Sequence, residues 1–202
     1  QKYVPPSLEE RKKDTTEKPQ LDYNNINTTT FDELDLNDKL LRGVYAMGFE
    51  KPSIIQQTAI LPVLHGHDVI AQAQSGTGKT ATFSIGLLNR IDDSVQQTQG
   101  LVLAHTRELA LQIHSVMTGL GQYMNFTYNL CVGGTLIKEN IDQLLQNPHI
   151  VIGTPGRVLD MINKKALHTR TLKMLVIDEA DEMLSKIFSN QIYDIFRFLP
   201  ND

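Results

Sequence analysis

The chain has 202 residues, 41% of them hydrophobic, which is enough for one ordinary domain with its own core and too few for two. Its 19 Lys and Arg residues against 23 Asp and Glu residues give a net charge of -4, which excludes a broadly basic surface that would hold nucleic acid by bulk electrostatics. No apolar stretch approaches the roughly 18 residues that span a bilayer, and a single cysteine cannot form an internal disulfide, so we expect no membrane contact and a reducing compartment, the cytoplasm or alternatively the nucleus.

The first 30 residues predict a flexible polar tail, because they contain three prolines and mixed charges with almost no apolar periodicity. From Phe31 the pattern changes, and a helix is expected from about Asn37 to Met47, where Gly48 ends it. Pro52 and Ser53 then open a second predicted helix that runs to about Leu64.

Beyond this point short β-rich runs alternate with helical patterns. Strands are expected at 68–71, 100–104, 127–132, 149–153 and 173–177. Helices are expected at 79–91, 107–120, 138–146, 157–163 and 190–199. This alternation predicts an α/β fold with right-handed crossovers and a mostly parallel twisted sheet covered by helices on both faces. In such sheets ligands gather at the carboxyl ends of the strands.

A glycine-rich segment, AQSGTGKT at Ala73–Thr80, lies between a predicted strand and a predicted helix, as a phosphate-binding loop requires. Gly76 and Gly78 let backbone N–H groups close around phosphate oxygens. Lys79 would reach the β- and γ-phosphates, and Thr80 would ligate Mg²⁺. Alanine stands where the general pattern has its first glycine. The alternative, a plain glycine turn, is disfavoured by the strand and helix on either side.

A pair of acidic residues directly follows the apolar run Met174–Ile177. A buried strand would deliver these acids to its end, where Asp178 would hold Mg²⁺, partly through water, and Glu179 would polarise the water that attacks the γ-phosphate. Alone, the sequence DEAD would also suit the first turn of a helix, whose dipole favours acidic residues. Together with Lys79, the nucleotide interpretation is the stronger one.

The segment GFEKPSIIQ at Gly48–Gln56 is the candidate for binding the base of the nucleotide. The Gln56 amide can donate to and accept from the N6 and N7 edge of adenine, and Phe49 offers a ring face for stacking. By itself this segment is weak evidence for base binding, because a Gln on an exposed helix face and a Phe in the core are ordinary assignments.

Taken together, these motifs resemble the first RecA-like domain of a DEAD-box ATP-dependent RNA helicase, over residues 31–202. The matching motifs, in the family's order, are Phe31, the Gln motif, AQSGTGKT, TRELA at Thr106–Ala110, the pair Gly133 and Gly134, TPGR at Thr154–Arg157, and DEAD. The sequence around these motifs is similar to that of the translation initiation factor 4A group, which includes its exon-junction relative. Taken singly, the glycine pair and TPGR would be turns, and their order is what makes them specific.

The resemblance implies ATP and Mg²⁺ as cofactors and a role for each motif residue. Phe49, Lys51 and Gln56 would contact adenine or its surroundings. The phosphates would be held by Ser75, Gly76, Thr77, Gly78, Lys79 and Thr80. The residues that serve the reaction would be Lys79, Asp178 and Glu179, with Thr80 and Asp178 at the metal. One RNA strand would be gripped by its backbone at Thr106, Arg107, Gly133, Gly134, Thr154, Gly156 and Arg157. Such contacts bind phosphate without reading bases, so binding should be independent of sequence and sensitive to salt.

Two positions depart from the family pattern. His105 stands where a proline normally precedes TRELA, which removes a fixed φ and returns a backbone donor. Ile187 stands where a glycine is usual, and a β-branched side chain suits positive φ poorly, so the turn after DEAD is expected to be repositioned. The RNA grip is therefore less firmly predicted than the nucleotide site.

The chain starts at Gln1 and stops at Asp202, so we expect a fragment truncated before the family's Ser-Ala-Thr motif and without the second RecA-like domain. That domain supplies arginine fingers in the family, and without them the chain alone should be nearly inactive. The leading hypothesis is the ATP-binding half of an RNA helicase in translation initiation or mRNA metabolism. Its expected partners are one RNA strand, the second domain and a helical scaffold protein of the initiation-factor type. The rivals are a divergent non-hydrolysing interaction protein that docks on a scaffold, and another P-loop NTPase such as a small-molecule kinase or DNA helicase.

Overall fold

The computed structural model describes residues 28–200, so the predicted tail lies outside the described residues up to position 27. A 3₁₀ turn over Phe31–Leu34 precedes the first helix. The helices are α1 (Asp38–Ala46), α2 (Ile54–Leu64), α3 (Lys79–Arg90), α4 (Arg107–Leu120), α5 (Ile137–Leu144), α6 (Pro155–Asn163), α7 (Ala180–Met183) and α8 (Ser189–Phe196). The strands are β1 (Gly100–Leu103), β2 (Tyr128–Cys131), β3 (Ile150–Gly153) and β4 (Met174–Ile177).

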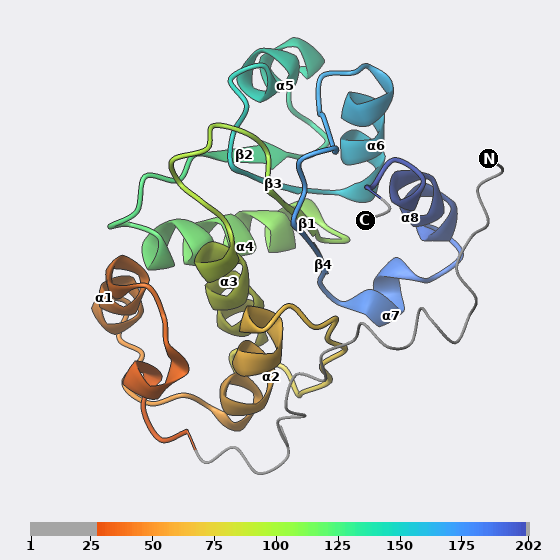
Figure 1. The fold of residues 1–202 in the computed structure, drawn as a ribbon. Coiled ribbons are helices and arrows are strands. Elements are labelled where there is room, and N and C mark those ends of the chain that lie inside the picture. Colours follow the sequence, from red (N-terminus) through yellow and green to blue (C-terminus); the bar gives the residue numbers. More distant parts are fainter. Residues whose placement is uncertain (1–27, 201–202) are drawn as a thin grey trace, which may run out of the picture.

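The four strands form one parallel sheet in the order β2-β3-β1-β4 (Figure 1). β1 is central, with Leu103 paired to Gly153 of β3 on one side and to Ile177 of β4 on the other. On the far side of β3, Cys131 of β2 is also paired with Gly153. All four carboxyl ends therefore lie at one edge of the sheet, in register with one another.

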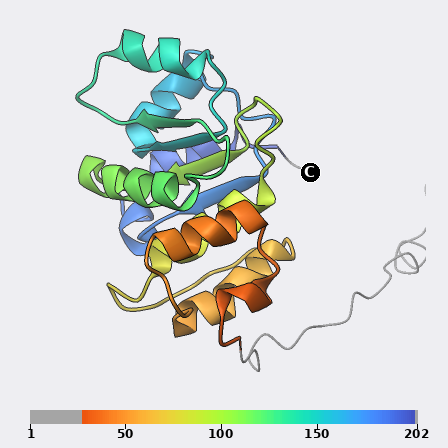
Figure 2. The ribbon, with the colours of Figure 1, turned by 90° about the vertical axis from the view of Figure 1, so that its left-hand side faces the viewer.

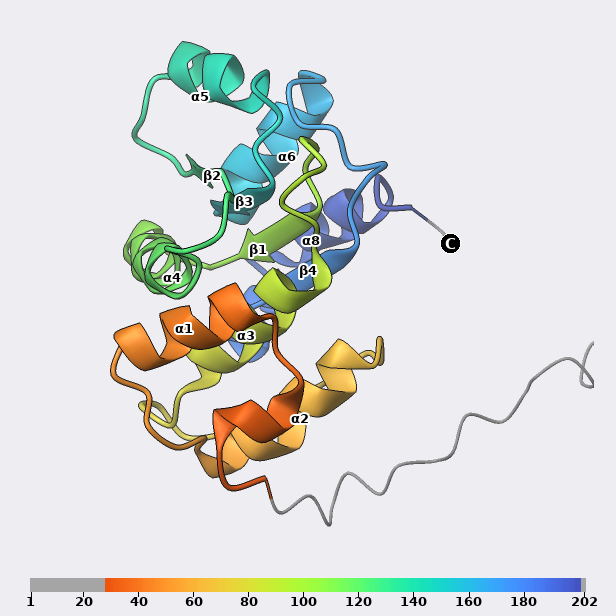
Figure 3. The same cartoon turned by 60° about the vertical axis from the view of Figure 1, so that its left-hand side comes forward.

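Successive side chains of each strand enter two different cores, as the period of an extended chain requires. Val102, Ile152 and Val176 belong to the core that α1, α3 and α4 cover. Leu101, Leu103, Cys131 and Val151 belong to the core beneath α6 and α8. Figures 2 and 3 show α5 and α6 on one side of the strands and α1 and α3 on the other. The predicted α/β fold with helices on both faces is confirmed.

Local signals in the sequence explain where several helices begin. The Asn37 side chain accepts from the Lys39 N–H at 2.9 Å and caps α1, and the Thr106 hydroxyl accepts from the Leu109 N–H at 3.2 Å and caps α4. Pro155 occupies the first turn of α6, where its missing N–H is not needed. Since α4 and α6 start directly after β1 and β3, these caps also fix the loops at the sheet edge.

The strand predicted at 68–71 is wrong. This segment forms no strand, and residues 68–77 make no backbone–backbone hydrogen bond within the described part of the chain. Ile70 is fully exposed and Val69 is 38% exposed. The β-rich composition is a preference for a pleated, paired surface, and this segment pairs with none of the strands within residues 28–200.

Ile187 does not adopt the positive φ that would be unfavourable for a β-branched residue. It lies in the turn between α7 and α8, is 76% exposed, and does not adopt a positive φ. The non-glycine residues with positive φ in the described chain are Asp35, Asn147, Lys165 and Glu179. The turn thus accepts a β-branched residue without the strain expected from the sequence.

We predict that Gly43→Ala destabilises the chain. A Cβ at Gly43 of α1 would lie 1.8 Å from the Leu120 carbonyl oxygen at the end of α4, so the two helices would have to separate. The expected overpacking cost of about 1–3 kcal/mol exceeds the gain of about 0.5–1 kcal/mol from removing a helical glycine. Urea denaturation followed by circular dichroism measures the difference.

The matched control is Gly156→Ala in α6, where a Cβ would meet only the Gln191 side chain at an ordinary 3.6 Å. Its free energy of unfolding should change by less than about 0.5 kcal/mol. Equal effects of the two substitutions would contradict the close α1–α4 contact.

Candidate functional site

The predicted site residues are brought to one edge of the sheet, one group at the end of each strand. Following the strand order, Gly133 and Gly134 come after β2, Thr154 to Arg157 after β3, Thr106 and Arg107 after β1, and Asp178 with Glu179 after β4. The end of the central strand thus lies between the glycine and TPGR groups on one side and the carboxylates on the other.

The phosphate-binding loop closes around its own lysine. Gly76 and Gly78 have φ of 79° and 93°, values that strongly favour glycine, and the α3 helix begins at Lys79. The Lys79 ammonium donates to the Ala73 carbonyl oxygen at 2.7 Å, across the mouth of the loop. An arriving phosphate would replace this carbonyl as the partner of the ammonium, next to the N-terminus of a helix of 12 residues.

The start of α2 braces this loop. The Ser53 hydroxyl donates to the Thr77 carbonyl oxygen at 2.8 Å, and the Gln56 Nε2 donates to the Gly78 carbonyl oxygen at 3.4 Å. A Cβ at Gly78 would lie only 2.6 Å from Gln56 Nε2, so the loop and α2 fit closely. The role of Ser53 was not predicted, and the serine that opens a helix just before a Gln motif was the signal available for it.

Gln56 is itself buried, with 2% of its surface exposed. Its Oε1 accepts from the Ser53 backbone N–H at 2.8 Å, while its Nε2 faces Gly78. Both ends of the amide therefore have an internal partner, and one lone pair and one N–H remain for a base. The adenine contact of Gln56 stays a prediction. Its observed structural effect is to tie the phosphate-binding loop to α2.

Two further residues of this motif differ in exposure. The Phe49 ring is half-buried and packs edge to face against Phe31, with 6.4 Å between ring centroids and 73° between planes. Lys51 is exposed to solvent. Phe49 is thus anchored in the core, as an ordinary core residue would be, while part of its ring surface remains accessible for the predicted stacking.

The carboxylate pair follows β4 immediately. The Asp178 N–H donates to the Leu103 carbonyl oxygen at 3.0 Å, which extends the β1–β4 pairing and fixes this residue at the sheet edge. Burial raises the pKa of the Asp178 carboxyl above its usual value, and the hydrogen bond from the Glu179 N–H and the nearby Lys79 and His105 oppose this rise. Lys79 of the phosphate-binding loop is therefore near enough to the Asp178 carboxyl to lower its pKa.

Glu179 is the most strained residue of the pair. It is exposed and has φ of 52°, in the left-handed region that non-glycine residues rarely occupy, directly before the short helix α7. Such a conformation costs on the order of 1–3 kcal/mol and persists only where the surroundings hold it. The pairing of β4 and the Asp178 carboxylate, which accepts from the Glu179 N–H at 3.1 Å, provide that support.

The donor set at this point fits Mg²⁺. Within residues 28–200 no three His, Cys, Asp or Glu side chains cluster as a metal cage would require. Mg²⁺ commonly binds through one or two protein oxygens together with substrate phosphates and water, and Thr80 and Asp178 supply hard oxygens of that kind beside the loop. These two residues are the ones that would hold the ion.

His105 lies in the bend between β1 and α4. β1 is paired with β4, the strand that Asp178 follows. Its Nδ1 atom is buried and has no hydrogen-bond partner among the described residues. His105 is close enough to Asp178 to lower the pKa of its carboxyl. The departure from proline therefore places a polar ring in the bend that leads to Thr106.

The glycine loop after β2 is in contact with the start of α4. Gly133 and Gly134 are exposed, and Gly134 has φ of 82°. The Arg107 Nη1 donates to the Gly133 carbonyl oxygen at 3.5 Å, and a Cβ at Gly134 would lie 2.8 Å from the same nitrogen. The predicted phosphate-gripping residues Arg107, Gly133 and Gly134 are thus brought together, with the guanidinium otherwise exposed.

The TPGR segment after β3 supplies Thr154, Gly156 and Arg157. The Thr154 N–H donates to the Cys131 carbonyl oxygen at 3.1 Å, and Gly156 is exposed in the first turn of α6. Arg157 is half-buried, and its Nη2 donates to the Thr135 carbonyl oxygen at 2.9 Å. The structure therefore joins the ends of β2 and β3 through Arg157, a contact that its place in a motif did not predict.

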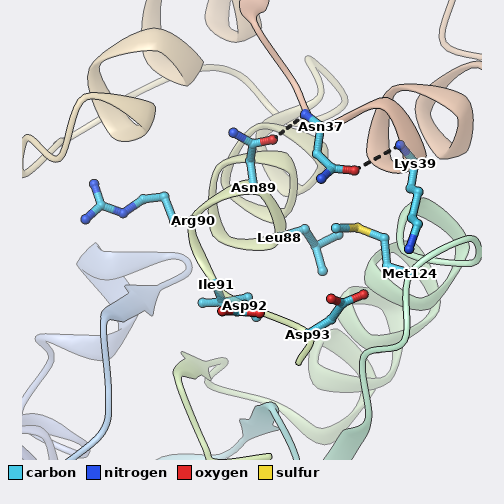
Figure 4. Close-up of a pocket in the computed structure, with 9 residues that line it drawn as sticks. All are labelled: Asn37, Lys39, Leu88, Asn89, Arg90, Ile91, Asp92, Asp93 and Met124. Carbon is cyan, nitrogen blue, oxygen red and sulfur yellow. Dashed lines mark hydrogen bonds between the residues drawn. The ribbon is translucent and has the colours of Figure 1, made fainter. Parts of the chain in front are cut away.

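A cavity of about 220 Å³ lies away from this edge, at the opposite end of α3. In Figure 4, Asn37 lies beside Asn89 of α3, whose Oδ1 accepts from the Asn37 N–H at 2.8 Å. A helix of 12 residues spans about 18 Å, so the cavity is remote from the phosphate-binding loop. Asp92 and Asp93 also line it, which makes it a poor anion site. None of the predicted site residues lines this cavity.

The chain is similar in sequence to several known proteins. The family model described as DEAD/DEAH box helicase matches residues 53–202. The chain is 58% identical over 171 residues to the ATP-dependent RNA helicase eIF4A of Pyricularia oryzae, covering 85% of this chain and 43% of that protein. It is also 58% identical over 172 residues to the ATP-dependent RNA helicase FAL1 of Mycosarcoma maydis, with the same coverage of 85% and 43%. The chain thus spans less than half the length of these relatives.

Two solved structures share the fold. Saccharomyces cerevisiae Dbp5 bound to RNA and ADP BeF3 superimposes with a TM-score of 0.78 at 41% sequence identity, covering 86% of this chain and 44% of that one. A DEAD box protein from Methanococcus jannaschii superimposes with a TM-score of 0.78 at 36% identity, covering 85% of this chain and 47% of that one.

In residues 28–200 of the present chain, no helix has the length and apolar character needed to cross a membrane.

We predict that Asp178→Asn stabilises the nucleotide-free chain at neutral pH. Because burial raises the pKa of Asp178 in the folded chain, its ionised form opposes folding above that pKa. The advantage of the neutral amide should therefore be present near pH 7 and disappear as the pH falls to about 4, the ordinary pKa of an aspartate. Thermal unfolding of both proteins across this range measures the difference.

Asp181→Asn is the matched control, because Asp181 is an exposed carboxylate three residues further along the same segment. It should leave the pH dependence unchanged. A stability difference for Asp178→Asn that is the same at both ends of the range would contradict the burial argument.

Proposed function

The chain belongs to the DEAD/DEAH box helicase family, and on this premise we propose that it is the ATP-binding half of an ATP-dependent RNA helicase. The observation that carries the proposal is the sheet edge, where Lys79 lies near enough to lower the pKa of Asp178, and the TPGR and glycine loops lie two and three strands away. The full protein would couple binding and hydrolysis of ATP to RNA binding and local unwinding of a duplex. Translation initiation or mRNA metabolism is the proposed setting, in the cytoplasm.

Each residue at the nucleotide would have its own role in hydrolysis. Loop N–H groups between Ser75 and Thr80 would surround the phosphates, and Lys79 would move from the Ala73 carbonyl oxygen to the β- and γ-phosphates. Glu179, exposed next to Asp178, would accept a proton from the attacking water. Mg²⁺ held by Thr80 and Asp178 would neutralise phosphate charge when bound. A second RecA-like domain would complete the charge stabilisation at the γ-phosphate.

Adenine is the proposed base. The remaining lone pair and N–H of Gln56 can form a pair with the N6 and N7 edge, and Phe49 and Lys51 lie close by in the sequence. Since Gln56 also holds Gly78, a base that engages Gln56 would be sensed directly by the phosphate-binding loop. One free acceptor and one free donor match adenine, whose N6 donates and N7 accepts, and not guanine, whose O6 and N7 both accept, so Gln56 supports ATP over GTP as substrate.

One RNA strand would lie across the ends of β2, β3 and β1. Arg107 and Arg157 supply positive charge there, and Thr106, Gly133, Gly134, Thr154 and Gly156 supply hydroxyl and backbone groups at helix starts and turns. None of these groups is placed by its chemistry to read a base, so the proposed binding is independent of sequence. The similar protein Dbp5 has been solved with RNA bound, which supports this assignment.

A scaffold protein is a further proposed partner. Dbp5 has been solved with Gle1, and also with Nup159 and Gle1. For the present chain a helical scaffold of the initiation-factor type is the corresponding proposal. The rival function, a non-hydrolysing RecA-like interaction protein, would keep such a partner while losing the nucleotide site. The intact Lys79, Asp178 and Glu179 favour the enzyme.

We predict that the chain binds Mg-ADP, and binds Mg-GDP at least tenfold more weakly. Isothermal titration calorimetry with each nucleotide measures both affinities. Lys79→Ala should abolish the ADP heat while leaving the circular dichroism spectrum unchanged, because Lys79 bonds only the Ala73 carbonyl oxygen in the nucleotide-free loop. Absence of binding by the folded parent chain would count against an autonomous nucleotide site and raise the interaction-protein alternative.

We predict that Gly156→Ala weakens RNA binding about tenfold without loss of stability, because the added methyl group would hold the RNA backbone away from the start of α6. Fluorescence anisotropy with a labelled oligouridine of roughly ten nucleotides at low salt measures the affinity. The control, Asn163→Ala, changes an exposed residue at the far end of α6 and should bind as the parent does. Equal binding by Gly156→Ala and the parent would remove this helix start from the RNA path.

A further inference from the structure

The half-buried Arg157 guanidinium is held by neutral acceptors. Its Nη1 donates to the Thr135 hydroxyl at 3.0 Å and to the Asn140 Oδ1, and its Nη2 donates to the Thr135 carbonyl oxygen at 2.9 Å. Thr135 directly follows the Gly133 and Gly134 pair, so these bonds attach the glycine loop to α6. The loop's geometry therefore depends on the Arg157 side chain.

Asn140 is the fixed point of this network. Only 2% of its surface is exposed, on α5, and its Nδ2 donates to the Leu130 carbonyl oxygen of β2 at 3.4 Å. The Thr135 hydroxyl lies 3.2 Å from the Asn140 Oδ1, which also accepts from Arg157. A buried amide with partners at both ends has one orientation, so it determines where the guanidinium lies.

The Arg157 guanidinium forms no ion pair with any carboxylate of residues 28–200. Among residues 28–200, the carboxylates in ion pairs are Asp160, which pairs with Lys164, and Asp194, which pairs with Arg197. A guanidinium has five N–H donors, so donors also remain after its three bonds to Thr135 and Asn140. A half-buried cation with unused donors, next to two exposed glycines, is suited to an anion that arrives from outside.

We propose that Asn140 is a positioning residue that orients Arg157 against the Gly133–Thr135 loop without neutralising it, so that the full charge serves an RNA phosphate. The inference rests on the proposed RNA-binding function of this edge and adds a residue that no motif contains. An aspartate at this position would offer the same acceptor geometry to Arg157. It would also cancel the charge, and that difference makes the proposal testable.

The test is Asn140→Asp, compared with the parent chain in anisotropy titrations of labelled oligouridine at salt concentrations from about 50 to 200 mM. We expect the affinity at the lowest salt to fall about fivefold to tenfold. We also expect the slope of log affinity against log salt to become shallower by about 0.7, the value for one phosphate contact on a single strand. A purely structural role of Asn140 would leave this slope unchanged.

The matched control is Asn163→Asp, which makes the same chemical change at an exposed position of α6 remote from the loop. It should retain the parent's affinity and slope. Equal losses for both substitutions would mean a general effect of net charge and would overturn the proposal, as would parent-like binding by a folded Asn140→Asp variant. No RNA binding by the parent itself would instead overturn the proposed function, and this inference with it.

A second variant covers the case in which Asn140→Asp does not fold, since the new carboxylate would face the Leu130 carbonyl oxygen. Leu136 is 68% exposed, occupies the N-cap of α5 and makes no side-chain cap. Leu136→Asp should stabilise α5 as a cap while placing a negative charge beside Thr135. The proposal expects higher thermal stability with weaker RNA binding and a shallower salt slope, and unchanged binding would overturn it.

Discussion

The parallel pairing of β1 with both β3 and β4 is the constraint on which the rest of the structure depends. Because all three strands run in the same direction and in register, the residues after Leu103, Gly153 and Ile177 must emerge side by side. A one-residue slip of β4 would turn Asp178 to the other face of the sheet and away from Lys79. The Asp178 N–H bond to the Leu103 carbonyl oxygen continues the ladder past the strand and prevents that slip. The placement of Asp178 at the sheet edge is therefore a consequence of sheet register.

The position of β1 also explains how two ligands could affect one another. Its continuation, His105 to Arg107, has the carboxylates on the β4 side and the glycine and TPGR loops on the β3 and β2 side. Arg107 reaches Gly133, and His105 influences Asp178. A shift of this short segment would therefore alter both groups of residues. The phosphate-binding loop, by contrast, is held from α2 through Ser53 and Gln56, so the proposed nucleotide site depends on α2 and the proposed RNA site on the loops.

Much of this arrangement could be predicted from the sequence, and the failures have physical causes. Helices and strands with strong periodicity or a cap, such as α4 behind Thr106 and β3, were predicted within a few residues. The glycine-rich segment does precede a helix, α3, although the strand expected before it is absent. Residues 68–71 were misjudged because strand propensity says nothing about whether a neighbouring strand exists to pair with. Ser53, Thr135 and Asn140 were missed because their importance arises from contacts with residues distant in sequence, which no local pattern records. Gln56 was assigned to a base alone, and the structure adds its internal bonds.

The site residues share a common energetic feature, in that each is held in a state that favours a ligand over the empty protein. Asp178 is an ionisable group in a half-buried position, and Glu179 has an unfavourable φ. Lys79 makes a single bond to a carbonyl oxygen, and Arg157 is charged among neutral acceptors. Each of these states costs stability in the empty chain, and each would be relieved by phosphate, metal or RNA. Since the costs are concentrated at the ends of four strands that pack into two hydrophobic cores, the sheet supplies the stability that the edge lacks. Substitutions that relieve one cost at this edge are therefore expected to strengthen the fold while they weaken binding.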